Sequence, residues 1–155
     1  MHRNKADALF FKAQKERNMQ TLTLKLTTAQ QYEDHENKDE MVIQGHLAER
    51  NGSTYITFKQ TDPDANITVD NRVKIKKGVV SIKRSGAVDS MMIFDEENPY
   101  TTYYETPYGH LNLYVTTYKV EHEVSEQGFK LHVHYEMKMQ GKKVSDNRYC
   151  LETIK

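Results

Sequence analysis

Hydrophobic and polar side chains alternate along most of the chain with a period of two, which is typical of β-strands that bury one face. The pattern begins at residues 22–26, where leucine fills every second position and threonine or lysine stands between. Continued along the chain, it predicts about ten strands. They cover residues 21–27, 41–47, 54–60, 66–76, 79–84, 89–95, 100–106, 110–124, 129–139 and 144–154.

Short segments rich in turn-forming residues separate these strands. Asn51-Gly52 is the strongest hairpin signal, because both central residues of a type I′ turn need a positive φ. The acidic residues 33–40 are predicted to form a solvated loop. Gly45, inside a strand, indicates either a β-bulge or a close approach of another backbone. Further turns are predicted at residues 62–64, 77–78, 95–99, 107–109, 126–128 and 140–142.

Evenly spaced strands without a long helix between them predict an all-β fold, built as a single antiparallel meander. Closure into a barrel of about 8–10 strands is favoured, because closure removes exposed sheet edges. Residues 1–18 differ, since they carry only a short helical stripe of apolar residues. A membrane anchor would need a longer apolar face. We therefore expect an N-terminal tail at residues 1–18, a short helix or disordered, and one β-barrel domain at residues 19–155.

Composition and charge limit the cellular compartments and the classes of binding partner that we expect. The chain has 22 basic and 22 acidic residues, so no global field draws it toward nucleic acid or an anionic membrane. Cys150 is the only cysteine, which excludes an intramolecular disulfide and favours a reducing compartment. The apolar run at residues 8–11 is too short for a signal peptide or a membrane span. We expect a soluble, cytoplasmic protein.

The centre of the chain carries several motifs in a particular order. Arg84-Ser85-Gly86-Ala87-Val88 follows a glycine-turned hairpin, and Met91 to Phe94 come next. Tyr103-Tyr104-Glu105-Thr106-Pro107-Tyr108-Gly109 then precedes leucines at positions 111 and 113. In order and spacing these motifs resemble the YwiB-like family of small bacterial proteins, with a weaker similarity over residues 21–154. The resemblance implies a calycin-like (lipocalin-type) β-barrel in a bacterial cytoplasm. It implies no catalytic residue, because the family has none assigned.

Histidines and basic residues are the first candidates for chemistry. His132 and His134 share one face of a predicted strand and make a plausible metal pair, but the opposite face, with Leu131 and Val133, is the core face. The pair is therefore expected in water, with His122 facing the other way, and no third ligand is spaced to complete a metal site. Residues 71–86 hold six basic residues and no acid. Because no aromatic residue lies among them, we favour a solvated strand face over a nucleic-acid site.

Arg84 is the second candidate, because it shares its strand parity with Val80 and Ile82 and is expected inside the barrel. A buried guanidinium must be paired or must meet an anion. The structural interpretation pairs it with Glu105 or with tyrosine hydroxyls. The functional one makes it the anchor for a carboxylate or phosphate head group, in a wall that offers hydroxyls and ring faces. The candidate ligand-binding residues are Arg84, Tyr103, Tyr104, Tyr108, Tyr114 and Glu105.

Two functions of different classes follow. The leading hypothesis is a non-enzymatic barrel that binds a small apolar or amphipathic molecule in its interior, without a cofactor or metal. The alternative is an interaction module with a filled core that binds protein or RNA through its outer surface. An enzyme ranks third, because no set of acid, base and nucleophile is evident and Cys150 is expected as a small buried thiol.

Overall fold

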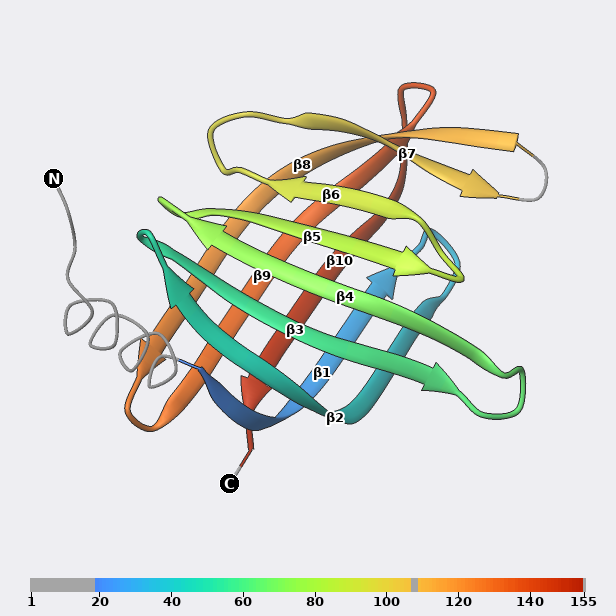
Figure 1. Cartoon of the computed structure of the whole chain (residues 1–155). Coiled ribbons are helices and arrows are strands. Elements are labelled where there is room, and N and C mark those ends of the chain that lie inside the picture. The colour runs from blue at the N-terminus through green and yellow to red at the C-terminus, as the bar shows by residue number, and fades with distance from the viewer. Residues whose placement is uncertain (1–18, 107–108, 155) are drawn as a thin grey trace, which may run out of the picture.

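The computed structural model describes residues 19–106 and 109–154, without the side chains of residues 103–106. Within this part of the chain, ten antiparallel strands form one sheet that curls into a nearly closed barrel (Figure 1). The predicted all-β barrel is confirmed. The tail expected at residues 1–18 lies outside the described residues. The strands are β1 (Gln20–Gln31), β2 (Glu36–Arg50), β3 (Ser53–Asp62), β4 (Ile67–Lys76), β5 (Val79–Gly86), β6 (Ser90–Phe94), β7 (Tyr100–Thr106), β8 (Gly109–Ser125), β9 (Gly128–Met139) and β10 (Lys142–Thr153).

The sheet order shows how the barrel closes. The strands follow the order β6-β5-β4-β3-β2-β1-β10-β9-β8-β7, so the first and last strands of the chain pair with each other. The edge strands β6 and β7 then meet from opposite sides. There the Thr102 hydroxyl donates a hydrogen bond to the carbonyl of Met91. Pairing of β1 with β10 thus joins two meanders into one curled sheet, as Figure 1 shows.

Tight hairpins set the strand register. Asn51 and Gly52 have φ values of 53° and 78°, as the type I′ prediction requires. Lys77-Gly78 and Gln140-Gly141 repeat this pair of positive φ values. Gly45 stays in regular register with both neighbours, so it is a close approach and not a bulge. A Cβ there would lie 2.7 Å from Cδ1 of Leu24.

The prediction of a solvated loop at residues 33–40 is wrong for residues 36–40. β2 begins at Glu36, and residues 36–40 pair with residues 27–31 of β1. Their charged side chains are exposed, so composition alone indicated a loop. The neighbouring strand supplies the hydrogen-bond ladder, and pairing overrides the low strand propensity of these residues. The consequence is a long β1–β2 wall at one end of the barrel.

The apolar core fills the barrel interior from alternate positions of the strands, as the period of two predicts. Leu131 and Val133 are 0% and 2% exposed, which confirms the predicted core face of β9. In β8 the inward-facing positions change from odd numbers, which are buried, to even numbers, which are partly buried, because the register shifts between Thr117 and Lys119. The extra residue of this β-bulge is Tyr118, which is turned to the outer surface.

Candidate functional site

One end of the barrel interior is hollow. A cavity of about 540 Å³ lies among side chains from β1 to β6, β9 and β10. The lining extends from the middle of some strands, such as Tyr149 of β10, to the ends of others, such as Gln30 of β1. Exposed Asp39, Glu40 and Met41 belong to the lining, so the cavity opens to solvent at this end. Its size is within the range of small-molecule sites.

A chain of polar side chains crosses one wall of the cavity. Asn71 Nδ2 donates to Oε1 of Gln60 at 2.9 Å, and Arg84 Nη2 donates to the same oxygen at 3.2 Å. Arg84 pairs with buried Asn71 across β4 and β5, so both side chains are on the inner face. Arg84 therefore points inward, as its parity predicts. Among the described residues Gln60 is one partner of Arg84. The pairing with Glu105 or tyrosines that the sequence indicated stays a prediction, because the side chain of Glu105 lies outside the described residues.

The opposite wall holds a tyrosine hydroxyl without a partner. The Tyr149 ring is half-buried against the core, but its hydroxyl is buried and has no hydrogen-bond partner among the described residues. Loss of solvation raises the pKa of Tyr149, the proximity of Tyr135 raises it further, and the charge of Arg84 opposes the rise. The hydroxyl therefore stays protonated as a donor. A buried donor left unsatisfied costs about 1–3 kcal/mol, so an acceptor that reached it would be stabilised.

Apolar and adaptable side chains make up the rest of the lining. Phe94 and Tyr135 stack in a tilted arrangement with ring centroids 4.6 Å apart. Methionine thioethers fill irregular space and tolerate different shapes. The apolar lining residues are Leu26, Met41, Ile82, Met92, Phe94 and Met137. The cavity thus combines an apolar lining with one polar wall.

The charges of the cavity are few. Arg84 is the only basic residue in the described lining, and Asp39 and Glu40 are the acidic ones. Glu40 is paired with Lys25 on the outer face, with 3.2 Å between Oε1 and Nζ. Asp39 pairs with Thr28 across the two strands, at an inward-facing register position, and is exposed at the rim. The positive charge is therefore deeper than the negative one.

The structure brings together a different set of residues from the one predicted. Tyr114 is 42% exposed on the outer face of β8, away from the cavity, because the neighbouring Val115 takes the inward position. Tyr108 and the side chains of Tyr103, Tyr104 and Glu105 lie outside the described residues. The sequence interpretation missed Gln60, Asn71 and Tyr149. In the sequence, each of these residues carries a polar group at a strand position where the alternation predicts an apolar side chain.

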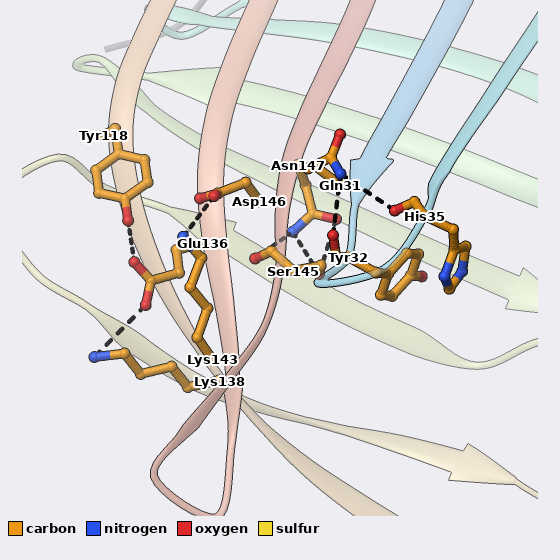
Figure 2. A network of polar contacts seen from close by, with 10 residues as sticks. All are labelled: Gln31, Tyr32, His35, Tyr118, Glu136, Lys138, Lys143, Ser145, Asp146 and Asn147. Carbon is orange, nitrogen blue, oxygen red and sulfur yellow. Dashed lines mark hydrogen bonds and ion pairs between the residues drawn. The ribbon is translucent and has the colours of Figure 1, made fainter.

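A separate polar network, which shares no residue with the described cavity lining, spans β8, β9 and β10 near the β9–β10 turn (Figure 2). The Tyr118 hydroxyl donates to Glu136, which raises the pKa of Tyr118 to about 12, and Lys138 pairs with the same carboxylate at 3.6 Å. Lys143 and Asp146 form an ion pair at 2.5 Å. Behind them, Asn147 is 1% exposed and its Nδ2 donates to Oγ of Ser145 at 3.0 Å. These groups satisfy one another, so the network is a structural feature.

The histidine pair and the cysteine come close to each other on the outer face. Cys150 pairs with His132 across β9 and β10, and Nε2 of His132 lies 3.9 Å from Oε2 of Glu152. His132 and His134 are half-buried, not fully in water as expected, and desolvation lowers the pKa of His134. Cys150 is half-buried, and desolvation raises the pKa of its thiol. A thiol held in its protonated form is a poor nucleophile, so this arrangement does not resemble an activated cysteine.

His122 pairs with Leu131 and so shares the inner-face parity, opposite to His132, as expected. It is nevertheless exposed. Among the described residues, no group of three or more histidine, cysteine, aspartate or glutamate side chains is arranged to hold a metal ion. In the same part of the chain, no helix is long and apolar enough to cross a membrane.

The basic residues of segment 71–86, apart from inward-pointing Arg84 and Lys77 in the turn, lie on the outer face of β4 and β5. The structure adds an aromatic residue to this face. Tyr55 of β3 pairs with Lys74, and the Arg72 guanidinium carbon is 5.1 Å from the Tyr55 ring centroid. A hollow of about 610 Å³ beside them is lined in part by His46, Lys59 and Lys83. Considering residues 71–86 alone missed this ring, because it comes from the preceding strand.

Comparisons with known proteins place the chain among its relatives. A family model described as "Domain of unknown function (DUF1934)" matches residues 24–151. None of the curated proteins matches the chain. The crystal structure of the YwiB protein from Bacillus subtilis is similar, with a TM-score of 0.75 and 19% sequence identity over 94% of this chain and 99% of that one. The resemblance found in the sequence is thereby confirmed. The chain belongs to the DUF1934 family, the YwiB-like proteins.

Proposed function

We propose that the protein is a non-enzymatic binding protein that holds a small amphipathic molecule in the cavity at the end of the barrel. The observation that carries the proposal is the pairing of an open cavity of about 540 Å³ with a buried hydroxyl that lacks a partner. Unsatisfied polar groups in a core cost stability, and sites built for binding often contain such groups. The methionine and phenylalanine side chains fit an apolar body.

The same proposal states that the protein binds its ligand without catalysing a reaction. The described lining residues include no histidine, cysteine or lysine. The acids Asp39 and Glu40 are exposed at the rim, and Glu40 is paired with Lys25. The arrangement supports recognition of a ligand more than attack on one. A bacterial cytoplasmic setting, implied by the resemblance, belongs to this proposal as well.

Two tryptophan variants on one strand test the proposed site. Met92 lines the cavity, whereas the adjacent Met91 is 45% exposed on the outer face. Native mass spectrometry of freshly purified protein first shows whether a ligand co-purifies. We expect Met92→Trp to lose that ligand, and to lose binding of anilinonaphthalene sulfonate, because the indole fills the cavity. Met91→Trp is the matched control and should retain both. Equal binding by the two folded variants, or no binding by the wild type, would contradict the proposal.

A second candidate function rests on the outer face of β3 to β5. Tyr55 beside Arg72 and Lys74 supplies the combination of ring and cations that single-stranded nucleic acids bind. Recovery of RNA or a partner protein from lysate at low salt, with and without nuclease, tests it. Loss of the recovered RNA in Arg72→Gln, with Met92→Trp unaffected, would support this candidate over the cavity. Recovery of neither would count against it.

A further inference from the structure

The cavity lining contains one buried polar group whose hydrogen bond is unmet. The Tyr149 ring belongs to the lining, and its hydroxyl is the only buried side-chain polar atom among the described lining residues that lacks a hydrogen bond. Asn71 and Arg84 differ, because each already donates to Oε1 of Gln60 within the protein. A ligand in this cavity is therefore in contact with the side chain that lacks a partner.

A carbonyl oxygen satisfies this hydroxyl without creating a new unmet group. Burial raises the pKa of Tyr149, so the hydroxyl keeps its proton and can donate it. A ketone or ester oxygen accepts that hydrogen bond and carries no proton of its own. An alcohol can accept as well, but its O–H would then need an acceptor in a region where an unmatched donor is costly. The hydroxyl of Tyr149 thus favours a carbonyl over an alcohol.

The surroundings of the Tyr149 hydroxyl disfavour a charged ligand group. Loss of solvation is the largest cause of the raised pKa of Tyr149, and the opposing charge of Arg84 has a smaller effect. A carboxylate placed in such a poorly hydrated region gives up far more hydration than a neutral carbonyl does. Asp39, at an inward-facing register position on the rim, adds a negative charge at the mouth through which an anion would enter. A neutral acceptor is therefore favoured over an anion.

Apolar and flexible side chains surround the rest of the ligand space. Met92, Met137 and Phe94 belong to the lining, and Phe94 stacks on Tyr135 in the same wall. Because the Tyr149 hydroxyl is buried while part of its side chain is exposed, a ligand reaches the hydroxyl by displacing neighbouring side chains. Methionine thioethers allow such displacement, since they are flexible and tolerate different shapes. An apolar chain attached to a carbonyl fits this lining.

We propose that the ligand is a neutral amphipathic molecule with a carbonyl group, a ketone or an ester, whose oxygen accepts a hydrogen bond from the hydroxyl of Tyr149. Its apolar body packs on the methionine and phenylalanine side chains of the lining. The inference rests on the proposed function and adds the chemical class of the ligand. It makes Tyr149 the residue that selects among apolar molecules of similar size.

The test compares three ligands with the same number of carbon atoms, 2-octanone, 2-octanol and octanoate, by isothermal titration calorimetry of the full chain. We expect the wild type to bind 2-octanone about threefold to tenfold more tightly than 2-octanol, and more tightly than octanoate. In Tyr149→Phe the ratio of the affinities for 2-octanone and 2-octanol should fall to about one, because the donor is gone. Tyr114→Phe is the matched control, since it removes a hydroxyl from the outer face and should keep the preference.

Infrared spectroscopy of the bound ketone reports the hydrogen bond itself. The carbonyl stretch of 2-octanone should lie at lower frequency in the wild type than in Tyr149→Phe, because a donated hydrogen bond weakens the C=O bond. Equal affinity of the wild type for 2-octanone and 2-octanol, or an unshifted carbonyl stretch, overturns the carbonyl assignment and leaves the proposed function standing. Tighter binding of octanoate overturns the choice of a neutral ligand. Failure of all three ligands to bind contradicts the proposed function itself. Thermal melting confirms that each variant is folded. If Tyr149→Phe does not fold, comparison of the wild-type stretch with that of the ketone dissolved in hexane decides the matter.

Discussion

Inside the barrel, Arg84 donates a hydrogen bond from Nη2 to Oε1 of Gln60 at 3.2 Å. This contact joins β5 to β3 across β4, and Asn71 on β4 donates to the same oxygen. A charged side chain is thus oriented in the cavity wall by a neutral amide. The three side chains thereby tie neighbouring strands β3, β4 and β5 together on the inner face of the barrel.

Replacement of Arg84 by methionine should change the free energy of unfolding by no more than about 1 kcal/mol. The reason is that Gln60 Oε1 keeps Asn71 as its donor, at 2.9 Å. Chemical denaturation of wild type and Arg84→Met measures the difference. A loss of 3 kcal/mol or more, roughly what breaking a buried ion pair costs, would show that Arg84 is structural.

Leu131→Ala should lower the free energy of unfolding by about 2–5 kcal/mol, because the side chain is fully buried and its removal leaves a cavity. His132→Ala, on the opposite face of β9, should change it by no more than about 0.5 kcal/mol. The histidine loses little, since its Nε2 is already without a hydrogen bond among the described residues. Urea denaturation of both variants makes the comparison. A reversed order would contradict the assignment of the two faces.

Gly86 ends the Arg-Ser-Gly motif under a double constraint. Its φ is +105°, and a Cβ there would lie 2.8 Å from the carbonyl oxygen of Thr68. Gly78 has a φ of +78° but nothing within 4 Å of such a Cβ. Gly86→Ala should therefore destabilise the protein by about 1–3 kcal/mol more than Gly78→Ala. Thermal melting of the two variants compares them, and equal melting temperatures would refute the steric part of this account.

From the burial of the Tyr149 hydroxyl we predict that the stability of the folded protein falls at alkaline pH. Burial raises its pKa in the folded state above the ordinary value of 10.0, so the unfolded chain releases this proton first. The resulting contribution to stability is complete below about pH 10 and is lost as the pH rises, at about 1.4 kcal/mol per pH unit. Tyr149→Phe removes that loss. Urea denaturation from pH 8 to 11 should show the variant gaining on the wild type only above pH 10, and parallel curves would contradict a buried hydroxyl.

The exposed Tyr118 provides the control for this experiment. Its pKa is raised to about 12 mainly by the hydrogen bond to Glu136, at a site open to solvent. Screening by water makes its effect on stability smaller. Tyr118→Phe should therefore follow the wild type more closely than Tyr149→Phe does.

The sequence predicted the barrel well, because alternation and turn chemistry are local signals. Asn51-Gly52 identified its hairpin, and the leucines of β1 identified the buried face. The sequence-based prediction failed where pairing with a neighbouring strand decides the secondary structure. Residues 36–40 read as a loop from composition, yet β1 makes them a strand.

The residues of the cavity show the same difference between what neighbours on one strand can predict and what only distant strands determine. The inward orientation of Arg84 followed from Val80 and Ile82 on its own strand. Gln60 and Tyr149 come from strands far away in the sequence, and only the barrel brings them to the same cavity. Tyr114 was expected among them as part of a tyrosine-containing wall that faces Arg84, but its register turns it outward.

The most direct test of the central claim is the location of the ligand in solution. Methionine methyl groups report it by nuclear magnetic resonance of protein labelled with methyl-¹³C methionine, because Met92 and Met137 line the cavity while Met19 and Met91 are exposed. On titration with 2-octanone, the account predicts saturable shifts of the Met92 and Met137 methyl signals and none at Met19 and Met91. Shifts at Met19 or Met91, with Met92 and Met137 unchanged, would contradict it.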